Sequence, residues 1–392
     1  MVIGVVSHMY PGQSLPISGI FVKEELDSLS GFVELRLIAP LPNQQWFGEI
    51  GHESVSAGYP VARPFVLAFP RWFFQRLYPE SMALSLKKAG HIFDGCDCIH
   101  AHNVFPDGVA AVKAFGGSLP VIITVHGSDI NHFAMKPNLK PGIVDALNRA
   151  SYIICVSSAL ESTVKKLGVT SDTVVIPNGI DTELFTLGEK ENACNALKLD
   201  PGRPRILFAG NFVAVKGIEY CIRSLPQVLA AFPDCELLLI GAKHGTNDKK
   251  KYTPIIKQAG VEHAVRILEC MPRKSLPQWF HASDVVVMPS IKEGFGLVAA
   301  EALACGRPVV ATQSGGPEDI IEKGQGVLVA PQDSDALGYA LIRVLEGEGI
   351  SGADELAGSA QQRFSYNSVA QRIVDIYEKT LKKNKVLLMI EK

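Results

Sequence analysis

The chain has 392 residues, of which 47% are hydrophobic and 20% charged, and its formal net charge is −2. This composition indicates a globular protein, and the length favours two α/β domains over one core. The weak net charge gives no support to nucleic-acid binding. Neither a signal peptide nor an apolar run of about 18 residues is found, so we expect a cytoplasmic protein without a membrane-spanning helix.

The first predicted elements are a buried strand at residues 2–6 and a helix at 20–29, with a further strand at 35–38. The loop between the first strand and the helix is rich in glycine and proline and ends at Gly19. Ligands of open α/β sheets bind where strands end, so this loop is a candidate ligand site. A simple turn is the alternative interpretation.

Residues 60–92 combine aromatic and basic side chains. Two interpretations stay open. The aromatic residues could pack into the first domain, or they could form a face that rests on anionic lipid headgroups at the inner side of a membrane. The residues concerned are Phe65, Phe69, Trp72, Phe73, Phe74 and Tyr78, with Arg63, Arg71, Arg76, Lys87 and Lys88.

Histidines lie at the end of one further predicted strand and directly after the end of another. Residues 98–102 carry His100 and His102, and the strand at 121–125 is followed by His126 in the sequence His-Gly-Ser-Asp. A lone histidine is more often structural, but the position of His126 after a buried strand favours a functional role. We expect His100 and His102 to support the site rather than to bind a metal ion.

The first domain is predicted to end at residue 181, after a strand at 153–156, a helix at 158–167 and an Asn-Gly turn. The polar, proline-containing segment 182–204 is then expected to be an interdomain linker. The eight cysteines lack zinc-site spacing, and we expect buried, reduced thiols.

The second domain is predicted to begin with a strand at 205–209 and the loop Gly-Asn-Phe-Val-Ala-Val-Lys-Gly at 210–217. A glycine-rich loop between a strand and a helix suits an anion, because its backbone N–H groups point at the ligand. Lys216 could therefore neutralise a phosphate, whereas a solvated surface lysine is the simpler alternative. Strands at 235–240 and 265–268 follow, and the second leads to Met271.

Residues 284–316 predict a complete strand–helix–strand unit. Three valines at 285–287 form a buried strand, and residues 297–304 form a helix that ends near Gly306. The loop between them carries Glu293, and Glu301 follows on the helix. Carboxylates accept hydrogen bonds from hydroxyl groups, which sugars offer. Either acid alone would be explained by solvation, but their arrangement around a glycine-rich loop favours ligand binding.

This segment, with the pattern P-S-x-x-E-G-F-G-L-x-x-x-E-A-L-A-C-G-x-P-V-V-A-T, resembles the signature of retaining, nucleotide-sugar-dependent glycosyltransferases of family 4. The resemblance covers almost the whole chain and is strongest from 205 to 320. It implies the GT-B fold, in which two Rossmann-like domains face a cleft. Residues 1–181 would then be the acceptor side and 205–365 the donor side, with the helix at 366–381 crossing back onto the first domain.

The resemblance also implies an activity and a set of site residues. A sugar would pass from a nucleoside diphosphate to a glycan or lipid-linked acceptor in cell-envelope or exopolysaccharide synthesis, without a cofactor or metal ion. Glu293, His126 and Lys216 would be catalytic, while Asn211 stands where the family carries arginine. The expected donor-binding residues are Gly19, Asn211, Lys216, Met271, Glu293, Gly294, Phe295, Gly296, Leu297 and Glu301.

Two other functions are compatible with such a sequence: a nucleotide-sugar epimerase of GT-B fold and a non-catalytic nucleotide-sugar-binding protein. The sequence does not specify the donor sugar, its base, the acceptor, the linkage or the oligomeric state.

Overall fold

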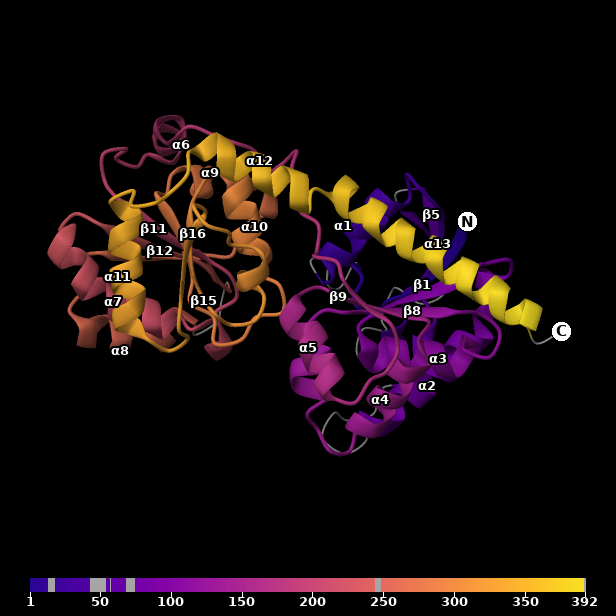
Figure 1. Cartoon of the computed structure of the whole chain (residues 1–392). Helices are drawn as coiled ribbons and strands as arrows, with labels where there is room; N and C mark the ends of the chain where they lie inside the picture. The colour runs from indigo at the N-terminus through magenta and orange to yellow at the C-terminus, as the bar shows by residue number, and fades with distance from the viewer. Residues whose placement is uncertain (13–17, 43–53, 57, 68–74, 244–247, 391–392) are drawn as a thin grey trace. The chain divides into compact units, whose positions relative to one another are not determined.

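The computed structural model describes residues 1–12, 18–42, 54–56, 58–67, 75–243 and 248–390 (Figure 1). The chain forms two compact units, Met1–Gly179 with Tyr366–Lys392 and Ile180–Ser365. Each unit is built around its own parallel sheet, so the predicted α/β class with two Rossmann-like domains is confirmed.

The sheet of the first unit has the strand order β10-β9-β8-β7-β1-β2-β5-β4. Its strands pair in parallel except for β4, which pairs with β5 in the antiparallel direction. The central strands β1 and β8 are almost wholly apolar because both faces of the sheet are covered, whereas β7 between them carries two buried histidines. The strands are β1 (Val2–Val6), β2 (Glu34–Ile38), β4 (Ser54–Ser56), β5 (Tyr59–Ala62), β7 (Cys98–His102), β8 (Val121–Val125), β9 (Tyr152–Cys155) and β10 (Thr173–Val175).

Helices cover both faces of this sheet. α1 and α13 contact each other, and their buried side chains join those of β1 and β2 in one core cluster. α2, α3 and α4 lie on the other face (Figure 1). The bounds are α1 (Ile20–Leu29), α2 (Tyr78–Lys88), α3 (Val109–Phe115), α4 (Lys140–Arg149), α5 (Ser158–Lys166) and α13 (Tyr366–Ile390), with a two-stranded ribbon of β3 (Leu41–Pro42) and β6 (Phe65–Val66).

The sheet of the second unit has the order β13-β12-β11-β14-β15-β16, and all its pairs are parallel. The strands are β11 (Arg205–Ala209), β12 (Glu236–Ala242), β13 (Val265–Glu269), β14 (Val285–Met288), β15 (Val309–Thr312) and β16 (Gly326–Val329). The helices are α6 (Lys190–Leu197), α7 (Ile218–Ala231), α8 (Asp248–Ala259), α9 (Leu276–His281), α10 (Leu297–Ala304), α11 (Ser334–Leu345) and α12 (Ala353–Phe364).

The segment 182–204, which was predicted as a linker from its polarity, belongs to the second unit. It contains α6, whose Ala193 and Cys194 are buried in a small cluster with Ala282. Lys190 Nζ also donates to Asp284 Oδ1 at 2.7 Å. The structure therefore differs from the prediction here, because one narrow apolar stripe and a tertiary ion pair hold a mostly polar helix in place.

Both sheets contain a point where the direction of strand addition reverses. In the first unit the chain runs outward from β1 to β2 and then returns to the other side of β1 with β7. In the second unit β11 leads to β12 and β13 on one side, and β14, β15 and β16 extend the other side. Open α/β sheets bind ligands at the carboxyl ends of the strands at such a reversal. The two candidate positions are therefore the ends of β1 and β7 and the ends of β11 and β14.

All eight cysteines are free, and all but the exposed Cys270 are buried, as expected for reduced thiols. None of the helices in the described residues combines the length and apolar character needed to cross a bilayer.

Candidate active site

The strand reversal of the second unit brings a lysine and a carboxylate together. Lys216 follows β11, Glu293 follows β14, and Lys216 Nζ lies 2.6 Å from Glu293 Oε2. Ser290 Oγ donates to the same oxygen at 3.0 Å. The Ile291 N–H donates to the Val215 carbonyl at 2.8 Å and joins the two loops. The side chains of Lys216 and Glu293 are 27% and 14% exposed, so a ligand can reach the pair.

The helix α10 begins beside this pair. Gly296 precedes it with φ 107°, a backbone conformation that residues with a side chain rarely adopt, so the turn favours glycine. The first N–H groups of a helix have no acceptor inside it and favour an anion. Phe295 is buried and packs against Phe364 at 5.8 Å between ring centroids, so its ring belongs to the core of the unit. Gly294 and Leu297 are half-buried in the same loop.

Glu301 lies on α10 and is only 5% exposed. Arg273 donates from Nη2 to Glu301 Oε1 at 2.7 Å, and its guanidinium carbon lies 5.2 Å from the centroid of the Phe185 ring. Arg273 was not among the site residues predicted from the sequence, although a buried carboxylate needs a cationic partner and this arginine comes two residues after Met271. Met271 itself is half-buried beyond the end of β13.

Asn211, which replaces the arginine of the family pattern, is exposed in the loop after β11. Its backbone carbonyl accepts a hydrogen bond from the Val213 N–H at 2.9 Å, which shapes the turn. The side-chain amide can donate a hydrogen bond to a phosphate but carries no charge.

In the first unit, His126 follows β8 and belongs to a cluster of imidazoles. His126 Nε2 lies 3.2 Å from His102 Nδ1, and the two rings are stacked 5.5 Å apart. Phe21 from α1 meets the His126 ring edge-on at 4.9 Å. Burial lowers the pKa of His126 to about 4 and that of His100 to about 3, and it lowers the pKa of His102 well below the usual value. All three rings are therefore neutral at pH 7.

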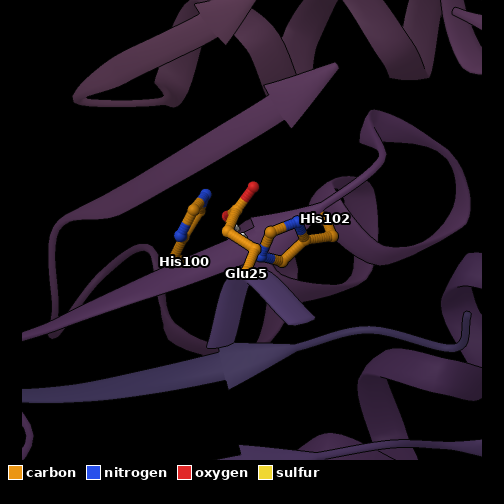
Figure 2. A group of neighbouring side chains, drawn as sticks. All are labelled: Glu25, His100 and His102. Carbon is orange, nitrogen blue, oxygen red and sulfur yellow. Dashed lines mark ion pairs between the residues drawn. The ribbon is translucent and has the colours of Figure 1, made fainter. Parts of the chain in front are cut away.

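Within the described part of the chain, Glu25, His100 and His102 are the group whose three donor atoms come close enough to hold a metal ion, within 4.8 Å of one another (Figure 2). However, His100 Nδ1 is 2.7 Å from the Tyr377 hydroxyl and His100 Nε2 is 2.7 Å from Thr124 Oγ1. Both nitrogens of His100 are thus in use. Glu25 and His102 alone offer fewer ligands than the three or four that a zinc site needs, so the cluster does not fit a metal ion.

The strand reversal of the first unit holds a second polar pair that the sequence analysis did not find. His8 follows β1, and its N–H and Nδ1 lie 2.7 Å and 2.5 Å from the two oxygens of the fully buried Asp107. Both residues come shortly after buried strands, and this position in the sequence is the feature that could have marked them as candidates for a site. Nearby, Gly19 has φ 66°, and a Cβ atom there would lie 2.1 Å from the Met9 carbonyl oxygen. Backbone packing alone therefore requires this glycine.

The aromatic and basic segment is only partly described. Phe69, Arg71, Trp72, Phe73 and Phe74 lie outside the described residues. Among the others, Arg63 faces inward: it donates to the Pro11 carbonyl at 2.5 Å and lies over the Tyr10 ring at 5.6 Å. Phe65 is 37% exposed, and the exposed residues also include Arg76, Lys87 and Lys88. The described residues leave both interpretations of this segment open.

Two family models match the chain in succession. The model for glycosyltransferase family 4 matches residues 26–184, and the model for glycosyl transferases group 1 matches residues 189–368.

The relatives include a Bacillus subtilis protein named as the teichuronic acid biosynthesis glycosyltransferase TuaC, which is 28% identical over 96% of this chain and 98% of its own length. They also include a D-inositol 3-phosphate glycosyltransferase of Xylanimonas cellulosilytica, which is 29% identical over 76% of each chain.

Solved structures share the fold. Sucrose-phosphate synthase from Thermosynechococcus elongatus superimposes with a TM-score of 0.81 at 22% identity, covering 98% of this chain and all of the other. HepE of Anabaena, solved in complex with UDP and glucose, gives a TM-score of 0.73 at 23% identity over 97% of this chain and all of HepE.

Proposed function

Because the chain belongs to the family 4 glycosyltransferases with the GT-B fold, we propose that it transfers a sugar from a nucleoside diphosphate to an acceptor hydroxyl with retention of anomeric configuration. The observation that carries this proposal is the pair of Lys216 and Glu293 beside the N-terminus of α10. A diphosphate needs positive charge and N–H donors, whereas a sugar needs hydrogen-bond acceptors. Both are present where the central strands of the second unit end.

Each group has a role in this reaction. Negative charge grows on the diphosphate as the bond to the anomeric carbon breaks, and Lys216 with the first amides of α10 stabilises that charge. Asn211 adds a neutral donor. These groups supply the positive field that a metal ion provides in other enzymes, so the proposed reaction needs no metal. The leaving phosphate takes the proton of the acceptor hydroxyl on the same face of the sugar, which gives retention.

The two glutamates hold the donor. Glu293 accepts hydrogen bonds from hydroxyls of the transferred sugar and orients its anomeric carbon. Glu301 accepts hydrogen bonds from the ribose hydroxyls, because a carboxylate has about four acceptor sites and can bind Arg273 at the same time. Met271, beyond β13, lies in the segment that holds the base through backbone groups. His126, which belongs to the first unit, is the third residue that we propose to be catalytic, in addition to Glu293 and Lys216.

The comparisons suggest which donors and acceptors to test first. HepE was solved with UDP and with UDP-glucose, which makes UDP-sugars the first candidates. The name of TuaC supports a role in making a cell-envelope polymer. We propose a glycan or a lipid-linked glycan as the acceptor, with the enzyme on the cytoplasmic side of the membrane.

The proposal is tested by measuring melting temperatures of the full chain with a panel of UDP-, GDP- and ADP-sugars. A ligand at 100 times its dissociation constant stabilises the folded state by about 2.7 kcal/mol, and at least one donor should raise the melting temperature. That donor is then incubated with glycan acceptors, and the product is examined by NMR for the anomeric configuration. A donor that is converted only to its epimer, or that binds without turnover under all conditions, would contradict the proposal.

A further inference from the structure

Four buried polar atoms in the first unit lie along one row of side chains. In the described residues, seven buried side-chain atoms have no hydrogen-bond partner, and four of these are Glu25 Oε1, His102 Nε2, His126 Nδ1 and Asn178 Oδ1. Glu25 Oε1 lies 3.7 Å from His102 Nε2. At the other end, Asn178 interacts with His126 and raises its pKa against the effect of burial. The 3.2 Å contact between His102 and His126 joins these two pairs into one row.

The number of protons on these side chains determines which atom donates and which accepts in each contact of the row. A neutral imidazole has one N–H donor and one acceptor nitrogen, and His102 and His126 are both neutral. One assignment then gives each of the four atoms a partner, once the 3.7 Å between Glu25 Oε1 and His102 Nε2 shortens to hydrogen-bond distance. In this assignment the Glu25 hydroxyl donates to His102 Nε2, His102 Nδ1–H donates to His126 Nε2, and His126 Nδ1–H donates to Asn178 Oδ1. The assignment requires that Glu25 carries a proton.

We propose that Glu25 is a positioning residue whose proton fixes the direction of this hydrogen-bond chain, and with it the tautomer of His126 and the orientation of the Asn178 amide. Its relevance to catalysis rests on the proposed function, since His126 is the residue of the first unit expected at the donor. The chain of hydrogen bonds does not rest on that function. Figure 2 shows the carboxyl group of Glu25 beside the rings of His100 and His102.

The surroundings of Glu25 keep this proton in place. Burial raises the pKa of Glu25 to about 8. The titratable groups that face it are His100 and His102 from β7, His126 beyond β8 and Tyr377 from α13. The imidazoles are neutral, and among the described residues the basic group within ion-pair distance of Glu25 is His102. No full positive charge is therefore next to the carboxyl group to favour its ionised form.

Loss of the Glu25 proton would reverse the whole chain. His102 would donate from Nε2–H to the carboxylate, and His126 would donate from Nε2–H to His102 Nδ1. His126 Nδ1 would then be an acceptor, so the Asn178 amide would have to turn its NH₂ group toward it. Each ring keeps one proton throughout, and the chain loses only the proton of Glu25.

The test is nitrogen NMR of the full chain labelled with ¹⁵N-histidine, at about pH 6.5 and about pH 9.5, on either side of the Glu25 titration. The His126 signals are assigned by their loss in His126→Gln. In the wild type, His126 should carry its proton on Nδ1 at the lower pH and on Nε2 at the higher pH. In Glu25→Gln the amide donates as the protonated acid does but cannot ionise, so the proton should stay on Nδ1 at both values.

Glu24→Gln is the matched control, because Glu24 is on the same helix and accepts a hydrogen bond from the Tyr366 hydroxyl instead. This variant should behave as the wild type does. The proposal is overturned if wild-type His126 is protonated on Nε2 at the lower pH, if its tautomer is the same at both values, or if Glu25→Gln still reverses. It is also overturned if the purified protein holds one equivalent of zinc that Glu25→Gln loses. The NMR result is independent of donor transfer, so failure of the proposed function is recognised separately.

Discussion

Lys216 and Glu293 lie 77 residues apart in the sequence, yet the Nζ of one is 2.6 Å from the Oε2 of the other. The reason is the strand order, which makes β11 and β14 neighbours although β12 and β13 lie between them in the chain. Each side chain holds the other at the end of the sheet when no donor is bound. Because the pair is partly exposed, its contribution to stability is small. We therefore expect changes at this pair to affect catalysis more than folding.

The first prediction concerns Lys216. Replacing it with methionine removes a charge that stabilises the leaving diphosphate, so kcat should fall by about 10²- to 10³-fold. The melting temperature should change little. Steady-state kinetics with the identified donor measure this. Lys292→Met is the matched control, because Lys292 is exposed and next to Glu293, and it should retain wild-type turnover. A Lys216→Met enzyme with normal kcat would remove Lys216 from the proposed mechanism.

The second prediction concerns Arg273, which lies 2.7 Å from the buried Glu301. Arg273→Met leaves the Glu301 carboxylate buried without this partner. Breaking a buried pair costs about 3–5 kcal/mol, and the partial exposure of Arg273 should reduce this to about 1–3 kcal/mol. Urea unfolding measures the loss, and donor affinity should fall as well because Glu301 is no longer held. Lys274→Met, at the exposed neighbouring position, should change neither. Equal stability of the two variants would show that the ion pair has no structural role.

The third prediction links Glu25 to pH. Its pKa is raised in the folded state to about 8, from an ordinary value of 4.5. Its contribution to stability is therefore fully present below about pH 4.5 and is lost as the pH rises through 8, because the unfolded chain gives up the proton first. Between about pH 6.5 and 8 the free energy of unfolding should fall by up to about 1.4 kcal/mol per pH unit from this group.

Glu25→Gln lacks this titration, so its stability relative to the wild type should increase with pH over the same range. Burial lowers the pKa values of the three histidines, so their titration changes the free energy of unfolding below about pH 6.5. Comparing the two proteins at each pH cancels this contribution. Urea unfolding at several pH values gives the difference directly. A constant difference between the two proteins from about pH 6.5 to 8 is incompatible with a Glu25 that is protonated in the folded state.

The fourth prediction concerns membrane contact. Lys87 and Lys88 are exposed at the end of α2, and each basic residue near an anionic bilayer contributes about 1 kcal/mol of attraction. If this face rests on the membrane, Lys87→Glu/Lys88→Glu should reduce co-sedimentation with phosphatidylserine vesicles at low salt. Lys165→Glu/Lys166→Glu on α5 makes the same charge change elsewhere in the first unit and should bind as the wild type does. If both variants bind equally, the aromatic segment serves packing instead.

Much of the fold was predictable from local sequence. The strands β1, β8 and β11 have the predicted bounds, because strands buried on both faces of a sheet are almost wholly apolar. The helices α1 and α10 also have the predicted bounds, and each begins directly after a glycine with positive φ. The segment 182–204 was not predictable in this way. Its helix α6 buries only a narrow stripe, and Lys190 is held by Asp284, which is far away in the sequence. Polarity therefore suggested a linker where the chain is folded against the second unit.

In the candidate site, too, some residues were predictable from the local sequence and others were not. Glu293 and Lys216 were singled out because each lies in a loop at the end of a buried strand, and Glu301 because it follows on the next helix. Their partners were not predictable, since Arg273 reaches Glu301 across 28 residues of sequence. Likewise, the contact between His8 and Asp107 spans 99 residues. Such pairs depend on strand order, which local patterns do not contain.

The most direct test of the proposed donor site is a calorimetric titration of UDP, GDP, ADP, CDP and dTDP into the full chain, because it examines the diphosphate site without knowledge of the sugar. We expect saturable binding of one nucleotide at a single site. In Glu301→Gln the dissociation constant should rise about tenfold, which corresponds to about 1.4 kcal/mol, while Lys292→Met should bind as the wild type does. Absence of binding by every nucleotide, or an unchanged dissociation constant in Glu301→Gln, would contradict the assignment of the donor site to the second unit.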